Sequence, residues 1–199
     1  MTGPGPGGTA TSASSPSRAG TAADSAGSAT TGAGGGLRPA READLATILR
    51  WRNHPQVREV SLTRHEIGAA EHAAWWAGVR VDPDRRVLVH EHLGQPCGVV
   101  TFSGVTSPDR ALTWGFYLDV EGLDARRALL PAWLSLEEAA IAYAFDTLGA
   151  RTLGGETLAT NRPVLALHRR FGFTIVRRYE RDVDGTPHQV VWTQLSRGT

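Results

Sequence analysis

All of the Trp, Tyr and Phe residues lie after residue 36, and this uneven distribution decides which part of the 199-residue chain can form a core. The first 36 residues consist almost entirely of Gly, Ala, Ser, Thr and Pro. Ordering a residue costs about 1–2 kcal/mol of backbone entropy, and these small side chains bury too little apolar surface to offset it. We therefore expect residues 1–36 to be a disordered tail and residues 37–199 to form one domain.

Charge, cysteine content and hydropathy exclude several classes of protein. The formal net charge is +1, whereas nucleic-acid-binding domains usually carry a large basic excess, so we expect no nucleic acid partner. A single cysteine, Cys97, cannot form an internal disulfide or a multi-cysteine zinc site. No apolar stretch approaches the roughly 18 residues that a membrane-spanning helix needs, and the tail lacks the apolar centre of a secretory signal. We expect a cytoplasmic protein without a membrane partner.

Hydrophobic periodicity and turn signals predict alternating helices and strands in the first half of the domain. A short extended piece at 37–40 precedes the helical patterns 40–53 and 67–80, and His54-Pro55 ends the first of these. Strands are expected at 86–93, 98–106 and 110–119, with Gly94-Gln95-Pro96 as the turn of a hairpin.

The second half continues the alternation after a loop at 120–130. A helix is expected at 131–148, with Pro131 in its first turn and Gly149 at its C-terminal cap, and a strand at 151–159. Asn161 is placed to cap a further helix. Two last strands, at 173–183 and 188–195, are expected to pair across Asp184-Gly185. The order predicts a mixed α/β sandwich around one sheet.

The segment NRPVLALHRRFGF at 161–173, together with this order of elements, resembles the GCN5-related N-acetyltransferase (GNAT) superfamily. The segment ILRWRNHPQVREVSLTRHEIGAAEHAAWW at 48–76 is similar to bacterial nucleotide-sugar N-acetyltransferases of pseudaminic-acid-type pathways, and more loosely to ribosomal-protein N-terminal acetyltransferases. The resemblance covers 37–195. It implies a single α/β domain with a mostly antiparallel central sheet flanked by helices, acetyl-CoA as cosubstrate, and no metal.

The same resemblance implies which residues hold the acyl donor. In the superfamily a bulged strand offers a backbone N–H to the thioester carbonyl and then separates from its neighbour to admit the pantetheine arm. The matching residues here are Gly115, Phe116, Tyr117 and Leu118, and Asn161 belongs to the same side. Without chemistry, this segment would be a core strand with a glycine bulge.

The resemblance also implies a site for the pyrophosphate of coenzyme A at the N-terminus of the helix that follows, where free N–H groups attract anions. The best frame runs from Arg127 to Ala132, with Arg126 beside it. Leu130 replaces the usual glycine of this frame, and Pro131 removes one N–H donor. The alternative is that both arginines are solvated loop residues.

Two residues are candidates for proton transfer. Glu156 matches a glutamate that relatives place near the acceptor amine, so it is a candidate general base, with a charged strand-end residue as the equal alternative. His168 stands where most relatives have a tyrosine that protonates the leaving thiolate. An imidazolium could do the same, but a packed helix histidine fits the position equally well.

Acceptor binding is assigned by resemblance to residues of the front helices and the sheet: Arg52, Asn53, His72, Ser103 and Tyr117. Arg52 could bind a nucleotide phosphate through two hydrogen bonds, or pair with Glu59. His72 could also cap a surface. The alternating His90 and His92 have no third ligand at a recognisable spacing, so no metal site is expected.

The expected function is therefore transfer of an acetyl group from acetyl-CoA to the amino group of a nucleotide-activated amino sugar, directly within a ternary complex. The resemblance leaves two alternatives open: acetylation of a peptide or ribosomal-protein amino terminus, and a catalytically silent domain that only binds. It also allows a homodimer.

Overall fold

Seven strands form one sheet in the computed structural model, which describes residues 35–198. Their order across the sheet is β1-β2-β3-β4-β5-β7-β6, and their bounds are Gly35–Pro39 (β1), Arg85–His92 (β2), Gln95–Ser103 (β3), Ala111–Leu118 (β4), Thr152–Leu158 (β5), Thr174–Val183 (β6) and Thr186–Ser196 (β7). Every neighbouring pair is antiparallel except β4 and β5, which are parallel. The expected mixed, mostly antiparallel sheet is confirmed.

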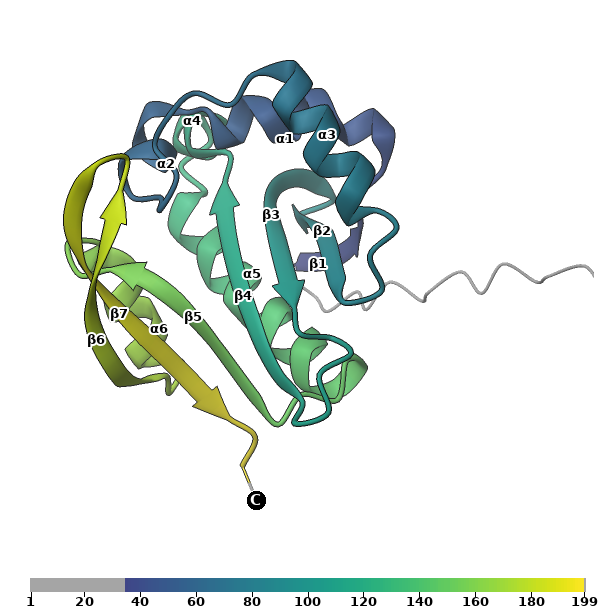
Figure 1. Ribbon diagram of the computed structural model, residues 1–199. Helices are drawn as coiled ribbons and strands as arrows, with labels where there is room; N and C mark the ends of the chain where they lie inside the picture. Colours follow the sequence, from purple (N-terminus) through teal and green to yellow (C-terminus); the bar gives the residue numbers. More distant parts are fainter. Residues whose placement is uncertain (1–34, 199) are drawn as a thin grey trace, which may run out of the picture.

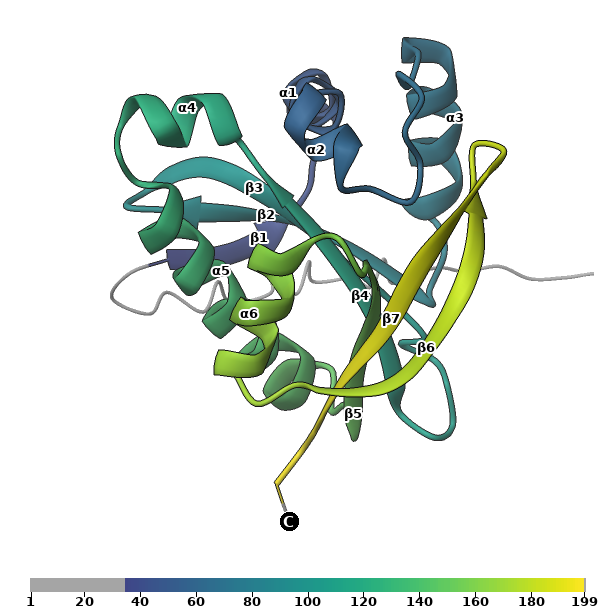
Figure 2. The ribbon, with the colours of Figure 1, turned by 90° about the vertical axis from the view of Figure 1, so that its left-hand side faces the viewer.

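Helices cover both faces of this sheet (Figures 1 and 2). The helices α1, α2 and α3 lie on one side, and α5 and α6 lie on the other. The bounds are Leu45–Arg52 (α1), Pro55–Glu59 (α2), Ala69–Val79 (α3), Val120–Ala125 (α4), Leu129–Ala142 (α5) and Arg162–Arg170 (α6). A short 3₁₀ turn, Glu42–Asp44, precedes α1, and a π-helical turn, Tyr143–Thr147, extends α5.

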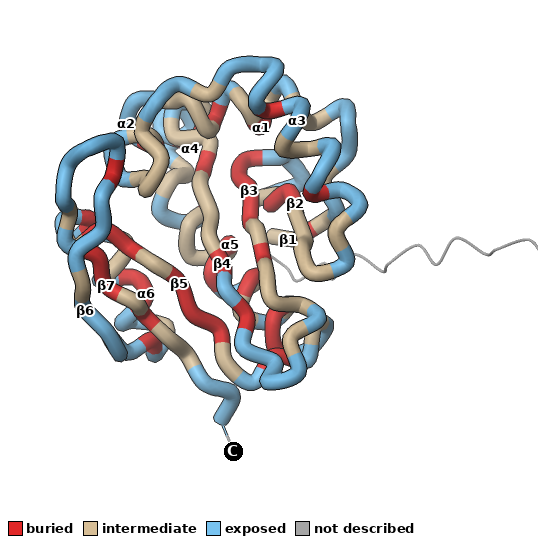
Figure 3. The backbone as a smooth tube through the Cα atoms, viewed as in Figure 1, coloured by how far each residue is buried: buried red, intermediate tan, exposed pale blue. Residues whose placement is uncertain are grey.

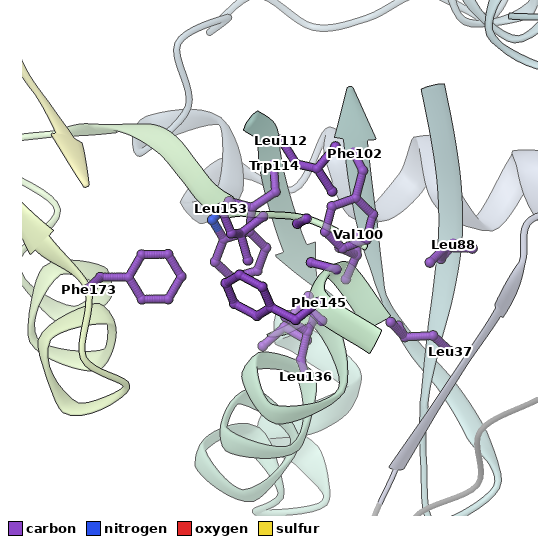
Figure 4. Packing of buried hydrophobic residues seen from close by; sticks show 14 of the residues in the cluster. Leu37, Leu88, Val100, Phe102, Leu112, Trp114, Leu136, Phe145, Leu153 and Phe173 are labelled. Atoms are coloured by element: carbon purple, nitrogen blue, oxygen red, sulfur yellow. The ribbon is translucent and has the colours of Figure 1, made fainter. Parts of the chain in front are cut away.

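Strand alternation sends successive side chains to opposite faces and so produces two cores. Val100 packs with Leu136 of α5 in the larger core, whereas its neighbour Val99 packs with Ile48 and Trp51 of α1 in a smaller one. Buried residues accordingly follow the middle strands of the sheet (Figure 3). Figure 4 shows the larger core, in which side chains from the sheet meet those of α5 and its extension.

The parallel pair β4 and β5 is joined over only part of its length. Pairing runs from Ala111↔Thr152 to Thr113↔Gly154 and stops there. Beyond these residues the two strands diverge, as Figure 1 shows, so the second half of β4 has a sheet neighbour on one side only. The separation of these strands, expected from the family resemblance, is present.

Several expected boundaries are corrected by the structure. Strand β1 begins at Gly35, so two residues assigned to the tail belong to the sheet, and the expectation for residues 1–34 lies outside the described residues. Residues 120–125 form helix α4 instead of loop, because the Asp119 side chain accepts a hydrogen bond from the Gly122 N–H and caps the helix. Helix α5 begins at Leu129, two residues earlier than expected.

Local backbone geometry accounts for two further differences. The turn between β2 and β3 consists of Leu93 and Gly94, both with positive φ, and Gln95 already pairs with His92. A two-residue turn with positive φ at both positions follows the twist of a hairpin. The short helix α2 has Pro55 at its start, where a missing N–H costs nothing, so the His54-Pro55 signal that ends α1 also begins α2.

Candidate active site

A cleft of about 920 Å³ lies where β4 and β5 separate. Its lining comes from both faces of the sheet, which makes it continuous through the gap. Among the expected site residues, those that line it are Arg52, His72, Gly115, Phe116, Tyr117, Leu118, Glu156, Asn161 and His168. The gap therefore brings together residues from five elements, and it is the candidate active site.

The backbone of β4 offers hydrogen-bonding groups to this gap. Asp119 donates its N–H to the Cys97 carbonyl across 2.8 Å, in continuation of the β3–β4 register. Because the groups of an antiparallel strand alternate in direction, odd-numbered residues face β3, and the N–H and C=O of Phe116 and Leu118 face the gap. No strand pairs with them among the described residues, since β5 has already turned away.

The expected bulge at Gly115 is absent. Pairing between β3 and β4 keeps one register from Gly98↔Leu118 to Ser103↔Thr113. A methyl group at Gly115 would meet only the Thr101 Oγ1, at 3.7 Å, so the surrounding protein does not require glycine there. The separation of β5, and not a bulge, is what frees the Phe116 N–H.

Aromatic side chains of α5 and α6 form the wall on one side of the gap. Phe116 packs edge-on against Trp133 of α5, with ring centroids 6.3 Å apart, and also against His168 of α6. The buried Trp133 Nε1 has no hydrogen-bond partner among the described residues. Asn161 caps α6 by accepting a hydrogen bond from the Val164 N–H through its side chain. The wall that these side chains form is predominantly apolar.

His168 is buried, and only one of its two ring nitrogens has a hydrogen-bond partner among the described residues. Its Nδ1 lies 2.9 Å from the Thr193 hydroxyl, and its Nε2 lies 3.6 Å from Glu137 Oε1. Burial lowers the pKa of His168 to about 4 and raises that of Glu137 to about 8, so both side chains are neutral near pH 7. The structure therefore favours the packed-histidine alternative over an imidazolium that protonates the leaving thiolate.

Glu156 lies on β5 at the opposite edge of the gap. The Tyr179 hydroxyl donates to its Oε1, and the Arg181 guanidinium donates to its Oε2. About a quarter of the Glu156 side chain remains exposed, at 24%. A partly exposed, ionised carboxylate beside the gap can accept a proton from an amine that approaches through the cleft.

The other side of the cleft carries cationic and aromatic groups. Arg52, at the end of α1, donates from Nη2 to the Thr63 carbonyl across 2.8 Å and forms no ion pair with Glu59. Its Nη1 is buried and has no partner within residues 35–198. His72 of α3 stacks on Trp75, with centroids 5.0 Å apart. A guanidinium nitrogen that is buried and unpaired beside a cleft is suited to bind an anion.

Five expected site residues do not reach the cleft. The Asn53 side chain forms two hydrogen bonds with the backbone of Ile67 and so fixes the loop after α2. Ser103 ends β3 in a regular pairing with Thr113. The remaining three were assigned to the pyrophosphate site: Arg126 donates to the Gln95 side chain, Arg127 is exposed with a φ of 53°, and Ala132 is fully buried in the core.

The structure adds residues that the sequence analysis did not select: Arg85 of β2, Trp75 of α3, Trp133 of α5, and Tyr179 and Arg181 of β6. Tyr179 and Arg181 stand two apart on one strand, so period-2 alternation places them on the same face. That spacing was available in the sequence. Their meeting with Glu156 was not, because it depends on the order β5-β7-β6.

The remaining side chains that could bind a metal or act as a nucleophile are hydrogen-bonded or buried outside the cleft. His90 and His92 both contact the Ser135 hydroxyl at 3.1 Å, and residues 35–198 contain no group of three or more His, Cys, Asp or Glu placed to hold a metal ion. Cys97 is fully buried, and burial raises its pKa to about 11, so it is not a reactive thiol. No helix in this range is long and apolar enough to span a membrane.

Comparison with known proteins gives a family match over most of the chain. Residues 36–174 match the family model described as acetyltransferase (GNAT) domain. Among curated proteins, the chain is similar to acetyltransferase PseH of Campylobacter jejuni subsp. jejuni serotype O:23/36 (strain 81-176). The two are 27% identical over 141 residues, which is 71% of this chain and 82% of PseH.

Solved structures share the fold at lower identity. A spermidine N-acetyltransferase from Vibrio cholerae, in complex with CoA and spermine, aligns with a TM-score of 0.69 and 16% identity over 81% of this chain and 95% of that one. Campylobacter jejuni PseH in complex with acetyl coenzyme A gives 0.56 and 19% over 82% and 99%. Mycobacterium smegmatis RimJ in complex with CoA-disulfide gives 0.67 and 18% over 81% of each chain.

Proposed function

The chain belongs to the acetyltransferase (GNAT) domain family, and from this premise we propose that it acetylates the amino group of a nucleotide-activated amino sugar. Acetyl-CoA is the donor. The acceptor class rests on the resemblance of residues 48–76 to nucleotide-sugar N-acetyltransferases and on the likeness to PseH. It also rests on the charge of the side of the cleft that Arg52 and Arg85 line, which we call the acceptor half.

The backbone of β4 offers a binding site for the donor. An extended pantetheine arm carries amide groups, and the unpaired N–H and C=O groups of Phe116 and Leu118 can bond to such an arm as a strand would. Acetyl-CoA supplies an activated acyl thioester. The Phe116 N–H is suited to stabilise the negative charge that develops on the thioester oxygen during attack.

The expected pyrophosphate site, the N-terminus of α5, is kept in this proposal, but only part of its expected frame lines the cleft. Ala132 is buried, and Arg126 and Arg127 lie outside the cleft lining. Leu129, in the first turn of α5, does line the cleft, and Leu130 is exposed at 62% and does not block it. We propose that the free N–H groups of this first turn, which Pro131 reduces by one, receive the pyrophosphate.

The observation that carries the acceptor assignment is the buried, unpaired Nη1 of Arg52. Arg85 and Arg181 also line the cleft, against the two acids Glu71 and Glu156. A polyamine such as spermidine would bring several positive charges to a lining in which three arginines already outnumber two acids. A nucleotide diphosphate would instead satisfy Arg52 with two hydrogen bonds.

Glu156 is the proposed general base, because an amine must lose its proton to attack a thioester. The carboxylate stands at the edge of the gap from which an acceptor amine reaches the thioester carbon. The neutral, buried His168 leaves the departing thiolate without an imidazolium donor. The proton that the amine releases therefore protonates the thiolate, through Glu156 or through water.

The acceptor assignment is tested by the release of free thiol from acetyl-CoA with three amines at equal concentration: a nucleotide-linked amino sugar, the same sugar without the nucleotide, and spermidine. We expect kcat/KM to be highest for the first. In Arg52→Gln, kcat/KM should fall at least about 10-fold for the nucleotide-linked sugar and little for the free sugar, since one charge-assisted pair contributes about 1.5–3 kcal/mol.

Equal rates with the free and the nucleotide-linked sugar would contradict the acceptor class. Faster turnover of spermidine would place the chain with the polyamine acetyltransferases. Arg50→Gln serves as the matched control, because Arg50 is an exposed residue of the same helix and does not line the cleft.

A further inference from the structure

The Glu156 carboxylate is held by two side chains that reach it across an intervening strand. Glu156 is on β5, whereas Tyr179 and Arg181 are on β6, and β7 lies between them. Glu156 pairs with Trp192 of β7, and Tyr179 pairs with Val190 of the same strand. The long side chains of Tyr179 and Arg181 reach across β7 on one face of the sheet. The β6–β7 hairpin therefore contacts the candidate base directly.

Each oxygen of the carboxylate receives one donor. The Tyr179 hydroxyl donates to Oε1 and the Arg181 guanidinium to Oε2. An ionised carboxylate has about four lone-pair positions, so both oxygens keep acceptor capacity for a substrate proton. Glu156 and Arg181 both line the cleft. The two donors therefore fix the direction of the carboxylate without blocking it.

Tyr179 is itself held in place. The Arg177 guanidinium lies over its ring, 4.7 Å from the centroid, and the ring packs beside the cluster of Leu158, Val183 and Val190. Arg181 has no such packing and is about half exposed, with 47% of its side chain accessible. An exposed ion pair contributes little to stability. The Arg181–Glu156 contact is therefore better explained by its effect on Glu156 than by its effect on the fold.

We infer that Tyr179 and Arg181 are positioning residues for the acetyl transfer, acting through Glu156. This inference rests on the proposed role of Glu156 as the base. It does not depend on which amine is the acceptor. Holding a base within reach of the reacting amine supplies part of the rate that proximity provides.

The test compares Tyr179→Phe, Arg181→Gln and Arg181→Lys with wild type, using the acceptor that wild type acetylates fastest. We expect kcat to fall about 10-fold in the first two variants, as part of the 10²–10⁴-fold that a positioned base contributes. The acceptor KM should change less than about 2-fold. The acidic limb of the pH–rate profile should move to higher pH, because the ionised carboxylate loses a hydrogen bond.

Two controls separate positioning from other roles. Arg178→Gln removes an arginine three residues before Arg181 on β6, whose side chain faces the opposite side of the sheet, and it should leave kcat and the pH profile unchanged. Arg181→Lys should recover part of the lost kcat, because an ammonium also donates to the carboxylate. Thermal unfolding of every variant checks that the fold is retained.

A double variant supplies the decisive comparison. If Arg181 acts through Glu156, Glu156→Gln/Arg181→Gln should be no slower than Glu156→Gln alone. A further loss in the double variant, carried by the acceptor KM, would overturn the inference and assign Arg181 to acceptor binding. An unchanged pH profile in both Tyr179→Phe and Arg181→Gln would also overturn it. Failure of the nucleotide-linked sugar as acceptor would affect only the acceptor assignment.

Discussion

Burial decides the protonation of single residues beside the cleft, and Glu137 is the clearest case. Its carboxyl group is fully buried, neither oxygen has a hydrogen-bond partner among the described residues, and His168 Nε2 lies 3.6 Å away. Burial penalises the charged form of each group, so the pKa of Glu137 rises and that of His168 falls. Two neutral groups thus sit side by side below the gap.

This state predicts how stability depends on pH. The pKa of Glu137 is about 8 in the folded chain, against an ordinary value of 4.5. The folded state therefore holds a proton that the unfolded state releases, and stability falls as pH rises through this window. Relative to wild type, Glu137→Gln should remove a slope of about 1.4 kcal/mol per pH unit, or about 3 kcal/mol between pH 5 and pH 7.

Urea unfolding of both proteins at several pH values measures this difference. The His168 contribution has the opposite sign, since a lowered pKa removes stability as pH falls from 6.5 towards 4. Above pH 6.5 the His168 contribution is the same in both proteins, so a difference in slope there comes from Glu137. Parallel stability curves for wild type and Glu137→Gln from pH 6.5 to pH 8 would mean that Glu137 is ionised in the folded chain.

At the level of secondary-structure elements, the place where β4 and β5 stop pairing determines where the cleft begins. Gly155 lies at this place, and no larger residue fits there. A Cβ at Gly155 would lie 2.7 Å from the Trp114 carbonyl oxygen, which belongs to the backbone of β4 and cannot move aside cheaply. At Gly115, across the gap, a Cβ would meet only one side-chain atom at 3.7 Å. Close packing therefore requires a glycine at position 155 but not at position 115.

We expect Gly155→Ala to lower the free energy of unfolding by about 1–3 kcal/mol, the usual cost of overpacking. Gly115→Ala should change it by less than about 0.5 kcal/mol. Chemical denaturation of both variants gives the comparison. Equal stabilities would show that β4 and β5 can separate further at no cost, and that their junction is not fixed by close backbone contact.

The same elements show what the sequence could predict. The turn at Asp184-Gly185 and the cap at Asn161 depend on residues close in the chain, and both are confirmed. The absent bulge at Gly115 depends on a distant partner, because β3 keeps β4 in register. The cap of α4, from the Gly122 N–H to the Asp119 side chain, is as local as the cap of α6, so its signal was present in the sequence. Gly115 was interpreted from a family pattern, and glycine alone does not specify a bulge.

At the scale of the whole molecule, the cleft is a product of topology. Glu156, Arg52 and Phe116 were all selected from the sequence, and the structure brings each to the cleft lining. Of the expected pyrophosphate frame, Leu129 lines the cleft, whereas Ala132 is buried and Arg127 lies outside the lining. Residue types indicated which chemistry to expect, whereas the fold decides which arginines line the cleft.

Contacts between segments far apart in the sequence form one wall of the acceptor half, and no local sequence pattern predicts such contacts. The loop after α2 bonds to the β6–β7 turn through the Arg64 N–H and the Asp184 carboxylate, at 3.0 Å. Leu62 of the same loop packs beside Leu158 and Val190. This places the loop that carries Thr63, the partner of Arg52, over the cleft and explains why the acceptor site could be predicted only in part.

The central claim is that the gap between β4 and β5 receives the acyl thioester at the Phe116 N–H. A crystal structure of the chain in complex with acetyl-CoA, or with a non-hydrolysable thioether analogue, tests it most directly. We expect the thioester carbonyl oxygen, or the atom that replaces it, to lie about 2.7–3.2 Å from the Phe116 nitrogen, with the arm between the two strands. Coenzyme A bound elsewhere, or β4 and β5 paired beyond Gly154 in the complex, would contradict it.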